Sequence, residues 1–250
     1  MQKTEYGPKL KEKEQSEYRK GVGKLLHMMR WSRPDILNAA REVSRFGQAA
    51  NPAQRQALNR ATEYCVQTPE RGLFLKPSGV WDGIDKSYKF IVRGISDSEH
   101  GKDIFTRRSV GGHTVYFCGA PVMLTSKMQR VVAVSVTEAE LIEGCDCAQD
   151  MMYVMRLVTY MKLQVELPMV CGMDNQGAID IINNWSSTGR TRHMDTKVKF
   201  ARELKEANII KFVWVPTKLN ESDTQTKNLH GPDFERCNAK YVGVDKYSVP

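Results

Sequence analysis

The sequence lacks the cysteine spacings that build zinc or redox sites. Its six cysteines include no CxxC pair, and none has a histidine at a spacing suited to zinc. Reduced and mostly buried thiols, as in an intracellular protein, are the better interpretation. Cys145 and Cys147, which fall on a predicted helix, are therefore interpreted as structural.

Long hydrophobic runs are also missing. Residues 1–20 are polar and charged throughout, so no signal peptide is predicted. The most apolar stretch, residues 151–170, is interrupted by Arg156, Lys162 and Glu166, and we do not expect it to span a membrane. No internal repeat and no low-complexity tract occurs.

Positive charge is in excess. The 37 Lys and Arg residues outnumber the 29 Asp and Glu residues and give a formal net charge of +8. This balance favours a polyanionic partner but does not by itself establish one, because many basic proteins bind no nucleic acid. The 250 residues suffice for one large domain or two small ones.

The hydrophobic pattern divides the chain in two. Apolar periodicity predicts three helices over residues 18–31, 32–46 and 52–67, and a segment bearing Pro, Gly and Asp follows at 77–85. We therefore predict a helical domain over residues 1–80, an α/β domain over 81–231 and an irregular tail over 232–250.

The second region alternates strands and helices. Gly-containing breaks at 109–112 and 119–120 favour antiparallel hairpins among its first strands. The pattern predicts a mixed five-stranded α/β sheet flanked by helices. Its predicted strands are 88–97, 114–118, 121–124, 168–173 and 209–215, and its helices are 135–161, 176–184, 192–207 and 222–229.

Four acids fall at the ends of these elements. Asp97 ends a strand, Glu138 begins the long helix, Asp174 stands at a strand-to-helix junction and Asp223 begins the last helix. Phosphodiester hydrolysis by two divalent metals needs hard oxygen ligands that converge from separate elements. Each acid also has a structural explanation, as a helix-capping or turn residue.

Glu138 offers a further test. It lies three residues before Leu141, on the stripe of the long helix that is predicted to be buried, whereas Glu140, Glu143 and Asp150 are predicted on the opposite face. An acid on the core face is costly unless it meets a cation or a metal. This favours Glu138 as a ligand, although its capping role stays open.

Eight motifs along residues 18–229 resemble one family, the Pol polyproteins of copia-type retrotransposons. Two resemble the end of a reverse transcriptase and six a ribonuclease H signature. The motifs are YRKGVGKLL at 18–26, SRPDI at 32–36, SKMQ at 126–129, SVTEAE at 135–140, DNQGAI at 174–179, RTRHMD at 190–195, WVPT at 214–217 and SDTQTK at 222–227.

The resemblance implies a ribonuclease H-like fold that cuts the RNA strand of RNA–DNA hybrids. Asp97, Glu138, Asp174 and Asp223 would be both the catalytic residues and the ligands of two Mg²⁺ ions, with Mn²⁺ as an alternative. The implied partners are the hybrid and the rest of a Pol polyprotein, and no membrane. The implied location is intracellular: the cytoplasm, virus-like particles or the nucleus.

The resemblance and the basic residues together predict a nucleic-acid surface. The alternative for its basic helix is a solvated face. The predicted contact residues are Lys127, Arg130, Asn175, Gln176, Arg190, Arg192, His193 and Lys197.

Some family features are missing. His100 stands where the family usually has Trp, and the loop 217–221 lacks the histidine that some ribonucleases H carry there. No paired-Asp polymerase motif occurs, so DNA synthesis is not expected. A non-catalytic nucleic-acid-binding remnant is the alternative function. An integrase-type core is disfavoured, because its last acid is usually Glu and here it is Asp223.

Overall fold

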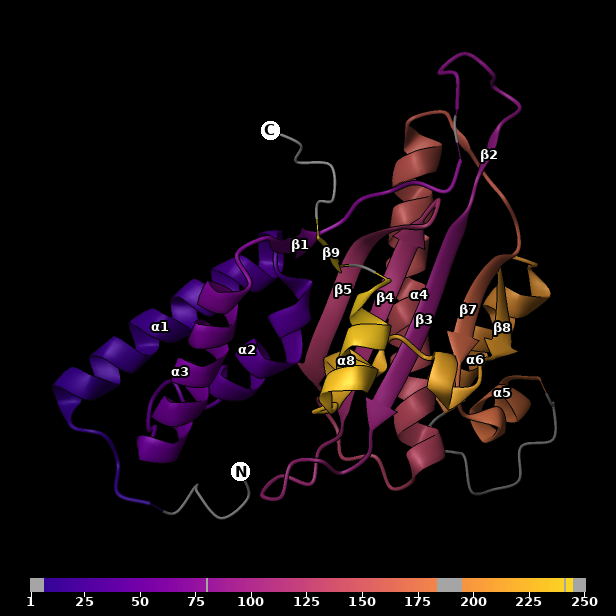
Figure 1. The fold of residues 1–250 in the computed structure, drawn as a ribbon. Coiled ribbons are helices and arrows are strands. Elements are labelled where there is room, and N and C mark those ends of the chain that lie inside the picture. The colour runs from indigo at the N-terminus through magenta and orange to yellow at the C-terminus, as the bar shows by residue number, and fades with distance from the viewer. Residues whose placement is uncertain (1–6, 80, 184–194, 241, 245–250) are drawn as a thin grey trace. The chain divides into compact units, whose positions relative to one another are not determined.

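The computed structural model, shown in Figure 1, describes residues 7–79, 81–183, 195–240 and 242–244. The chain forms two compact units. One combines Met1–Phe74 with His230–Pro250, and the other comprises Leu75–Leu229. The C-terminal segment therefore belongs with the N-terminal helices, which the sequence did not predict.

The first unit is mainly helical. Its elements are α1 (Glu12–Trp31), the 3-10 turn η1 (Pro34–Ile36), α2 (Leu37–Ser44), α3 (Pro52–Gln67), β1 (Arg71–Leu73), α8 (Gly231–Asn238) and β9 (Val242–Val244). Tyr18 and Leu25 of α1 lie in its core. Asn51 caps α3, because its side-chain oxygen accepts hydrogen bonds from the N–H groups of Ala53 and Gln54 at 2.9 and 3.2 Å.

The predicted irregular tail is wrong over the residues that the structure describes there. Helix α8 and strand β9 occupy most of it, and β9 pairs antiparallel with β1. Arg71 forms an ion pair of 2.9 Å with Glu235, 164 residues later in the chain. Hydrophobic periodicity reports only on neighbouring residues, so it gives no sign of contacts this distant in sequence. For that reason the pattern did not predict the short elements α8 and β9.

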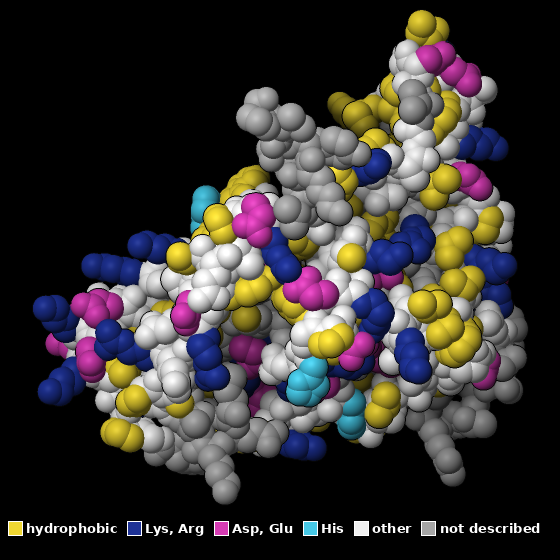
Figure 2. Space-filling model, in the orientation of Figure 1, with side chains coloured by type: hydrophobic (Ala, Val, Ile, Leu, Met, Phe, Trp, Pro, Cys, Tyr) yellow, Lys and Arg dark blue, Asp and Glu magenta, His cyan; other side chains and the backbone are white. Residues whose placement is uncertain are grey.

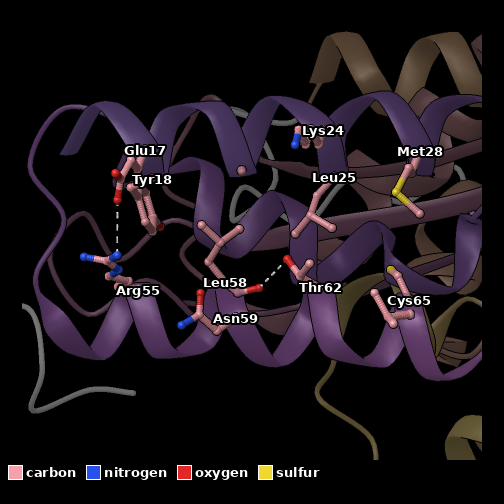
Figure 3. Close-up of a pocket in the computed structure, with 12 residues that line it drawn as sticks. Glu17, Tyr18, Lys24, Leu25, Met28, Arg55, Leu58, Asn59, Thr62 and Cys65 are labelled. Carbon is pink, nitrogen blue, oxygen red and sulfur yellow. Dashed lines mark hydrogen bonds and ion pairs between the residues drawn. The ribbon is translucent and has the colours of Figure 1, made fainter. Parts of the chain in front are cut away.

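A hollow of about 370 Å³ lies between α1 and α3 of the first unit (Figure 3). Leu25 and Leu58 lie along it, and an ion pair of 3.3 Å joins Arg55 to Glu17 at its edge. Glu17 is the one acid in this lining, so the hollow lacks the ligand set of a metal site.

The second unit contains the predicted sheet. Its strands are β2 (Lys89–Phe90), β3 (Val92–Glu99), β4 (Val110–Phe117), β5 (Ala120–Met128), β6 (Gln164–Val165), β7 (Met169–Met173) and β8 (Ile210–Trp214). Its helices are α4 (Val136–Tyr160), α5 (Gln176–Asn183), α6 (Asp195–Glu206), the 3-10 turn η3 (Thr217–Leu219) and α7 (Asp223–Thr226).

Five of these strands form one mixed sheet in the order β5-β4-β3-β7-β8. The pairs β3–β4 and β4–β5 are antiparallel, as the Gly-containing breaks predict, and β3–β7 and β7–β8 are parallel. The predicted α/β class and mixed five-stranded sheet are confirmed. Over the described residues, no helix is both long and apolar enough to cross a membrane.

Helix α4 packs closely against the sheet, and Gly94 of β3 permits the approach. A Cβ atom at Gly94 would lie 2.5 Å from the sulfur of Met151 and 2.6 Å from that of Cys147. Both residues belong to α4 and are completely buried in the main core. The missing side chain therefore sets how near the helix comes to the middle strand.

The register of the parallel strands determines which acids meet. Ile95 of β3 pairs with Gly172 of β7. Continued by two residues, this register places Asp97 level with Asp174. The carboxyl ends of β3 and β7 thus bring two of the predicted acids to one edge of the sheet.

Candidate metal centre

Three of the four predicted acids converge. Asp97 near the end of β3, Asp174 just after β7 and Asp223 at the start of α7 each offer one carboxylate oxygen, and these three oxygens lie within 4.8 Å of one another. Asp97 and Asp223 are buried, and Asp174 is half-buried. Clustered hard oxygens of this kind suit a divalent cation such as Mg²⁺.

Burial and mutual repulsion make it costly for these three acids to be ionised together. Burial, and then the neighbouring Asp97, raise the pKa of Asp223 to about 6 although Lys227 opposes the shift. The same two causes raise the pKa of Asp174. Carboxyl groups that resist ionisation in this way gain from a cation placed among them.

A lysine already stands at the cluster. The Lys227 Nζ atom lies 3.1 Å from Asp97 Oδ1 and 2.6 Å from Asp223 Oδ1. The hydroxyl of Thr226 donates a hydrogen bond to the other oxygen of Asp97. Sequence reasoning included both residues in the SDTQTK motif but gave neither a role.

The structure does not bring Glu138 into this group, and the prediction that it is a ligand is corrected here. The Glu138 N–H donates to Ser135 Oγ at 3.1 Å, and Glu138 Oε2 accepts a hydrogen bond of 2.6 Å from the N–H of Val134. These contacts satisfy N–H groups at the start of α4. The capping explanation that the sequence left open is the one that the structure supports.

Glu140 is the acid that sequence reasoning missed. Its Oε1 accepts hydrogen bonds from the N–H and the hydroxyl of Ser98, at 3.0 and 2.8 Å. Burial first, and then Asp97 and Asp174, raise the pKa of Glu140 to about 9. Its Oε2 is buried and has no hydrogen-bond partner among the described residues. Glu140 therefore lies near enough to Asp97 and Asp174 to feel their charge, with one oxygen unsatisfied, although it is not one of the three acids whose oxygens converge.

The helix-face argument failed for a physical reason. Every residue from Glu138 to Cys145 is buried, so the first turns of α4 have no solvent face from which a stripe could be recognised. Glu140 precedes Gly144 by one helical turn, and a Cβ at Gly144 would lie 2.7 Å from Met173 Cε on β7. Gly144 marks the side of α4 that meets β7, which only the tertiary packing reveals.

The predicted nucleic-acid residues are placed in two groups. Asn175 Oδ1 accepts a hydrogen bond of 3.0 Å from the N–H of Ala178, and Gln176 donates one of 2.8 Å to Asp180, so both make contacts local to α5. Lys127, Arg130 and Lys197 line a separate hollow of about 460 Å³. Arg190, Arg192 and His193 lie outside the described residues.

Asp146 of α4 organises that hollow. Lys127 Nζ lies 2.8 Å from one of its oxygens, and Lys197 Nζ lies 3.2 Å from the other. Burial would raise the pKa of Asp146, but the two lysines together lower it. On the face drawn in Figure 2, basic and acidic side chains are interspersed.

No protein-family model matches the chain. It is 31% identical over 221 residues to the retrovirus-related Pol polyprotein from transposon TNT 1-94 of Nicotiana tabacum, a match that covers 88% of this chain and 16% of that protein. It is 29% identical over 231 residues to the polyprotein from transposon RE1 of Arabidopsis thaliana, covering 92% and 15%. Over most of its length the chain is homologous to retrovirus-related Pol polyproteins of plant transposons.

This homology confirms the resemblance inferred from the motifs. The chain spans only 15–16% of the length of these relatives. Among solved structures, the chain is similar to LC11-RNase H1, isolated from compost, at 15% identity. That match covers 55% of this chain and 91% of the other, with a TM-score of 0.40.

Proposed function

We propose that the unit Leu75–Leu229 hydrolyses the RNA strand of RNA–DNA hybrids, as one domain of a transposon Pol polyprotein. The observation that carries the proposal is the convergence of Asp97, Asp174 and Asp223, with their oxygens within 4.8 Å of one another. Glu140 adds a fourth carboxyl group at the same edge of the sheet. Homology to the Pol polyproteins supports a nucleic-acid substrate.

The residues present fit divalent ions. The donors are all carboxylate oxygens, which Mg²⁺ prefers, and the buried Oε2 of Glu140 lacks a partner among the described residues. Asp97, Asp174, Asp223 and Glu140 would hold two ions, Mg²⁺ or Mn²⁺. When bound, the ions would activate the attacking water and stabilise the departing 3′ oxygen.

The chain's own contacts position these ligands. Ser98 holds Glu140 through two hydrogen bonds, and Thr226 holds Asp97 through one. Such partners fix the orientation of ligand side chains before the ions arrive. The hybrid would be recognised through its backbone shape and its 2′-hydroxyl groups, which distinguish RNA from DNA without reading sequence.

The test is cleavage of an end-labelled RNA–DNA hybrid by the full 250-residue chain. We expect cutting of the RNA strand alone in Mg²⁺ or Mn²⁺, none in EDTA, and loss of cutting in Asp174→Asn. Asp180→Asn is the matched control, because Asp180 lies on α5 and, among the described residues, its side chain accepts a hydrogen bond from Gln176 alone. Tight binding without cleavage would overturn the proposal in favour of a non-catalytic remnant.

A further inference from the structure

Lys227 occupies an unusual position for a cation at a metal centre. Its ammonium group lies within hydrogen-bond distance of both Asp97 and Asp223, at 3.1 and 2.6 Å. The side chain of Lys227 is 32% exposed, whereas those of Asp97 and Asp223 are 1% and 8% exposed. The lysine thus reaches from the rim to two acids that water hardly contacts.

The attraction between its ammonium group and the two carboxylates holds Lys227 at these acids. Burial would lower the pKa of Lys227, but Asp97 and Asp223 raise it further than burial lowers it, so the group stays charged. In return, Lys227 opposes the rise in the pKa of both Asp174 and Asp223. One ammonium group therefore offsets the mutual repulsion of three carboxylates.

An ammonium group and a divalent ion compete for the negative charge of the same carboxylates. Mg²⁺ holds its ligands at about 2.0–2.1 Å, and a positive charge that contacts those same oxygens would lie within a few ångströms of the ion. Repulsion at that distance is large in a partly buried site. Lys227 in its present position therefore weakens the attraction of Asp97 and Asp223 for an ion.

We propose that Lys227 is a built-in competitor for the divalent ion, which neutralises Asp97 and Asp223 until the ion displaces its ammonium group from them. The inference rests on the proposed function, because it needs the acids to bind a metal. Lys227 directly follows the short helix α7 and has an extended backbone (φ −111°, ψ 150°). Its long side chain can therefore leave the acids without unwinding a helix.

The first test compares Lys227→Met with the unmodified chain in the absence of nucleic acid. Mn²⁺ is the probe, and the signal of the free ion in electron paramagnetic resonance measures binding. We expect Lys227→Met to bind Mn²⁺ about 10-fold more tightly, because the competing positive charge is gone. In EDTA, Lys227→Met should melt at a lower temperature than the unmodified chain. Adding Mn²⁺ should raise its melting temperature by more than it raises that of the unmodified chain.

Lys211→Met is the matched control, because Lys211 is an exposed lysine on β8 of the same unit. Lys211→Met removes one positive charge at a position that does not contact the acids. It should change neither the Mn²⁺ affinity nor the rise in melting temperature that Mn²⁺ causes. Equal or weaker Mn²⁺ binding by Lys227→Met would overturn the competitor role alone. Absence of Mn²⁺ binding in every variant would overturn the proposed metal centre as well.

A second measurement does not depend on the folding of a variant. Reductive methylation of the unmodified chain, followed by mass spectrometry of its peptides, reports how readily each lysine reacts. We expect Lys227 to react slowly in EDTA, since its ammonium group is held by two carboxylates, and several-fold faster in saturating Mg²⁺. Lys211 should react equally in both conditions. A rate at Lys227 that Mg²⁺ leaves unchanged or lowers would contradict the proposal.

Discussion

The Nδ1 atom of His113 lies 2.6 Å from Glu143 Oε1, in the interior between β4 and α4. The other ring nitrogen of His113 lies 2.8 Å from Asp150 Oδ2. Burial alone would lower the pKa of His113, but the hydrogen bonds to Asp150 and Glu143 outweigh it and raise the pKa to about 9. A charged imidazole between two carboxylates thus joins the second strand of the sheet to the long helix.

This arrangement predicts a stability that depends on pH. The pKa of His113 is higher in the folded chain than the value of about 6.5 expected when unfolded. Its stabilising contribution is therefore complete below about pH 6.5 and is lost as the pH rises through about 9. We expect His113→Gln to lower the free energy of unfolding by about 3 kcal/mol at pH 6.

Urea denaturation of both proteins at pH 6, 7.5 and 9.5 measures this effect. The difference between them should shrink as the pH rises. Glu140 titrates in both proteins, so its contribution cancels in the comparison. Lys127, whose pKa is raised in part by Glu143 and Asp150, is likewise common to both. A difference that stays constant from pH 6 to pH 9.5 would mean that His113 is neutral in the folded chain.

Glu140 and Glu138 should differ sharply as sites of substitution. Glu140→Gln keeps the size of the side chain but removes a charge beside Asp97 and Asp174, and we expect hybrid cleavage to fall at least about 100-fold. Glu138→Gln keeps an oxygen that can accept from the N–H of Val134, so cleavage should change by no more than a few-fold. Rates measured at saturating Mg²⁺ decide between them. The opposite ranking would restore the assignment made from the sequence.

These two glutamates show where sequence reasoning reached its limit. Asp97, Asp174 and Asp223 were found because each lies at the end of an element, and strand order and direction follow from turns and periodicity. Glu138 and Glu140 lie on one helix, two residues apart. Choosing between them requires the rotation of α4 about its axis, which the packing of Gly144 against Met173 determines. That information is tertiary and has no local pattern.

The C-terminal elements illustrate a second limit. Strand β9 has three residues, and it pairs with β1, which is equally short. Neither segment is long enough for an alternating pattern to exceed chance. By contrast, α4 has 25 residues, and the helix predicted over 135–161 contains all of them. Length and local periodicity made the sheet and its long helix predictable. Strands β1 and β9 have neither, so the sequence did not predict that the C-terminal segment belongs to the first unit.

Gly94 should tolerate no side chain. A Cβ there would lie 2.5 Å from the sulfur of Met151 and 2.6 Å from that of Cys147, both completely buried, so the helix or the strand must move. We expect Gly94→Ala to lower the free energy of unfolding by about 2 kcal/mol. Gly23→Ala is the contrasting variant, because Gly23 lies in α1 with nothing within 4 Å of a built Cβ. It should stabilise the chain by about 0.5–1 kcal/mol.

Differential scanning calorimetry of the full chain measures both glycine variants. The transition of the unit that contains Gly94 should move to lower temperature, and the transition of the helical unit should move slightly upward in Gly23→Ala. If Gly94→Ala melted like the unmodified chain, the close approach of α4 to β3 would be incorrect.

Lys197 and Lys199 provide a matched pair for the predicted nucleic-acid surface. Both lie on α6, but Lys197 lines the hollow around Asp146, whereas Lys199 is 78% exposed and stands 3.9 Å from Glu203. If the hollow contacts a phosphate, Lys197→Ala should weaken hybrid binding and reduce the slope of log K against log salt by about one ion. Lys199→Ala should leave that slope unchanged. Fluorescence anisotropy with a labelled hybrid in Ca²⁺, from 50 to about 200 mM salt, covers the range over which such slopes are measured. Equal slopes for all three proteins would remove the hollow from the binding surface, because a phosphate contact cannot form without releasing its counterion.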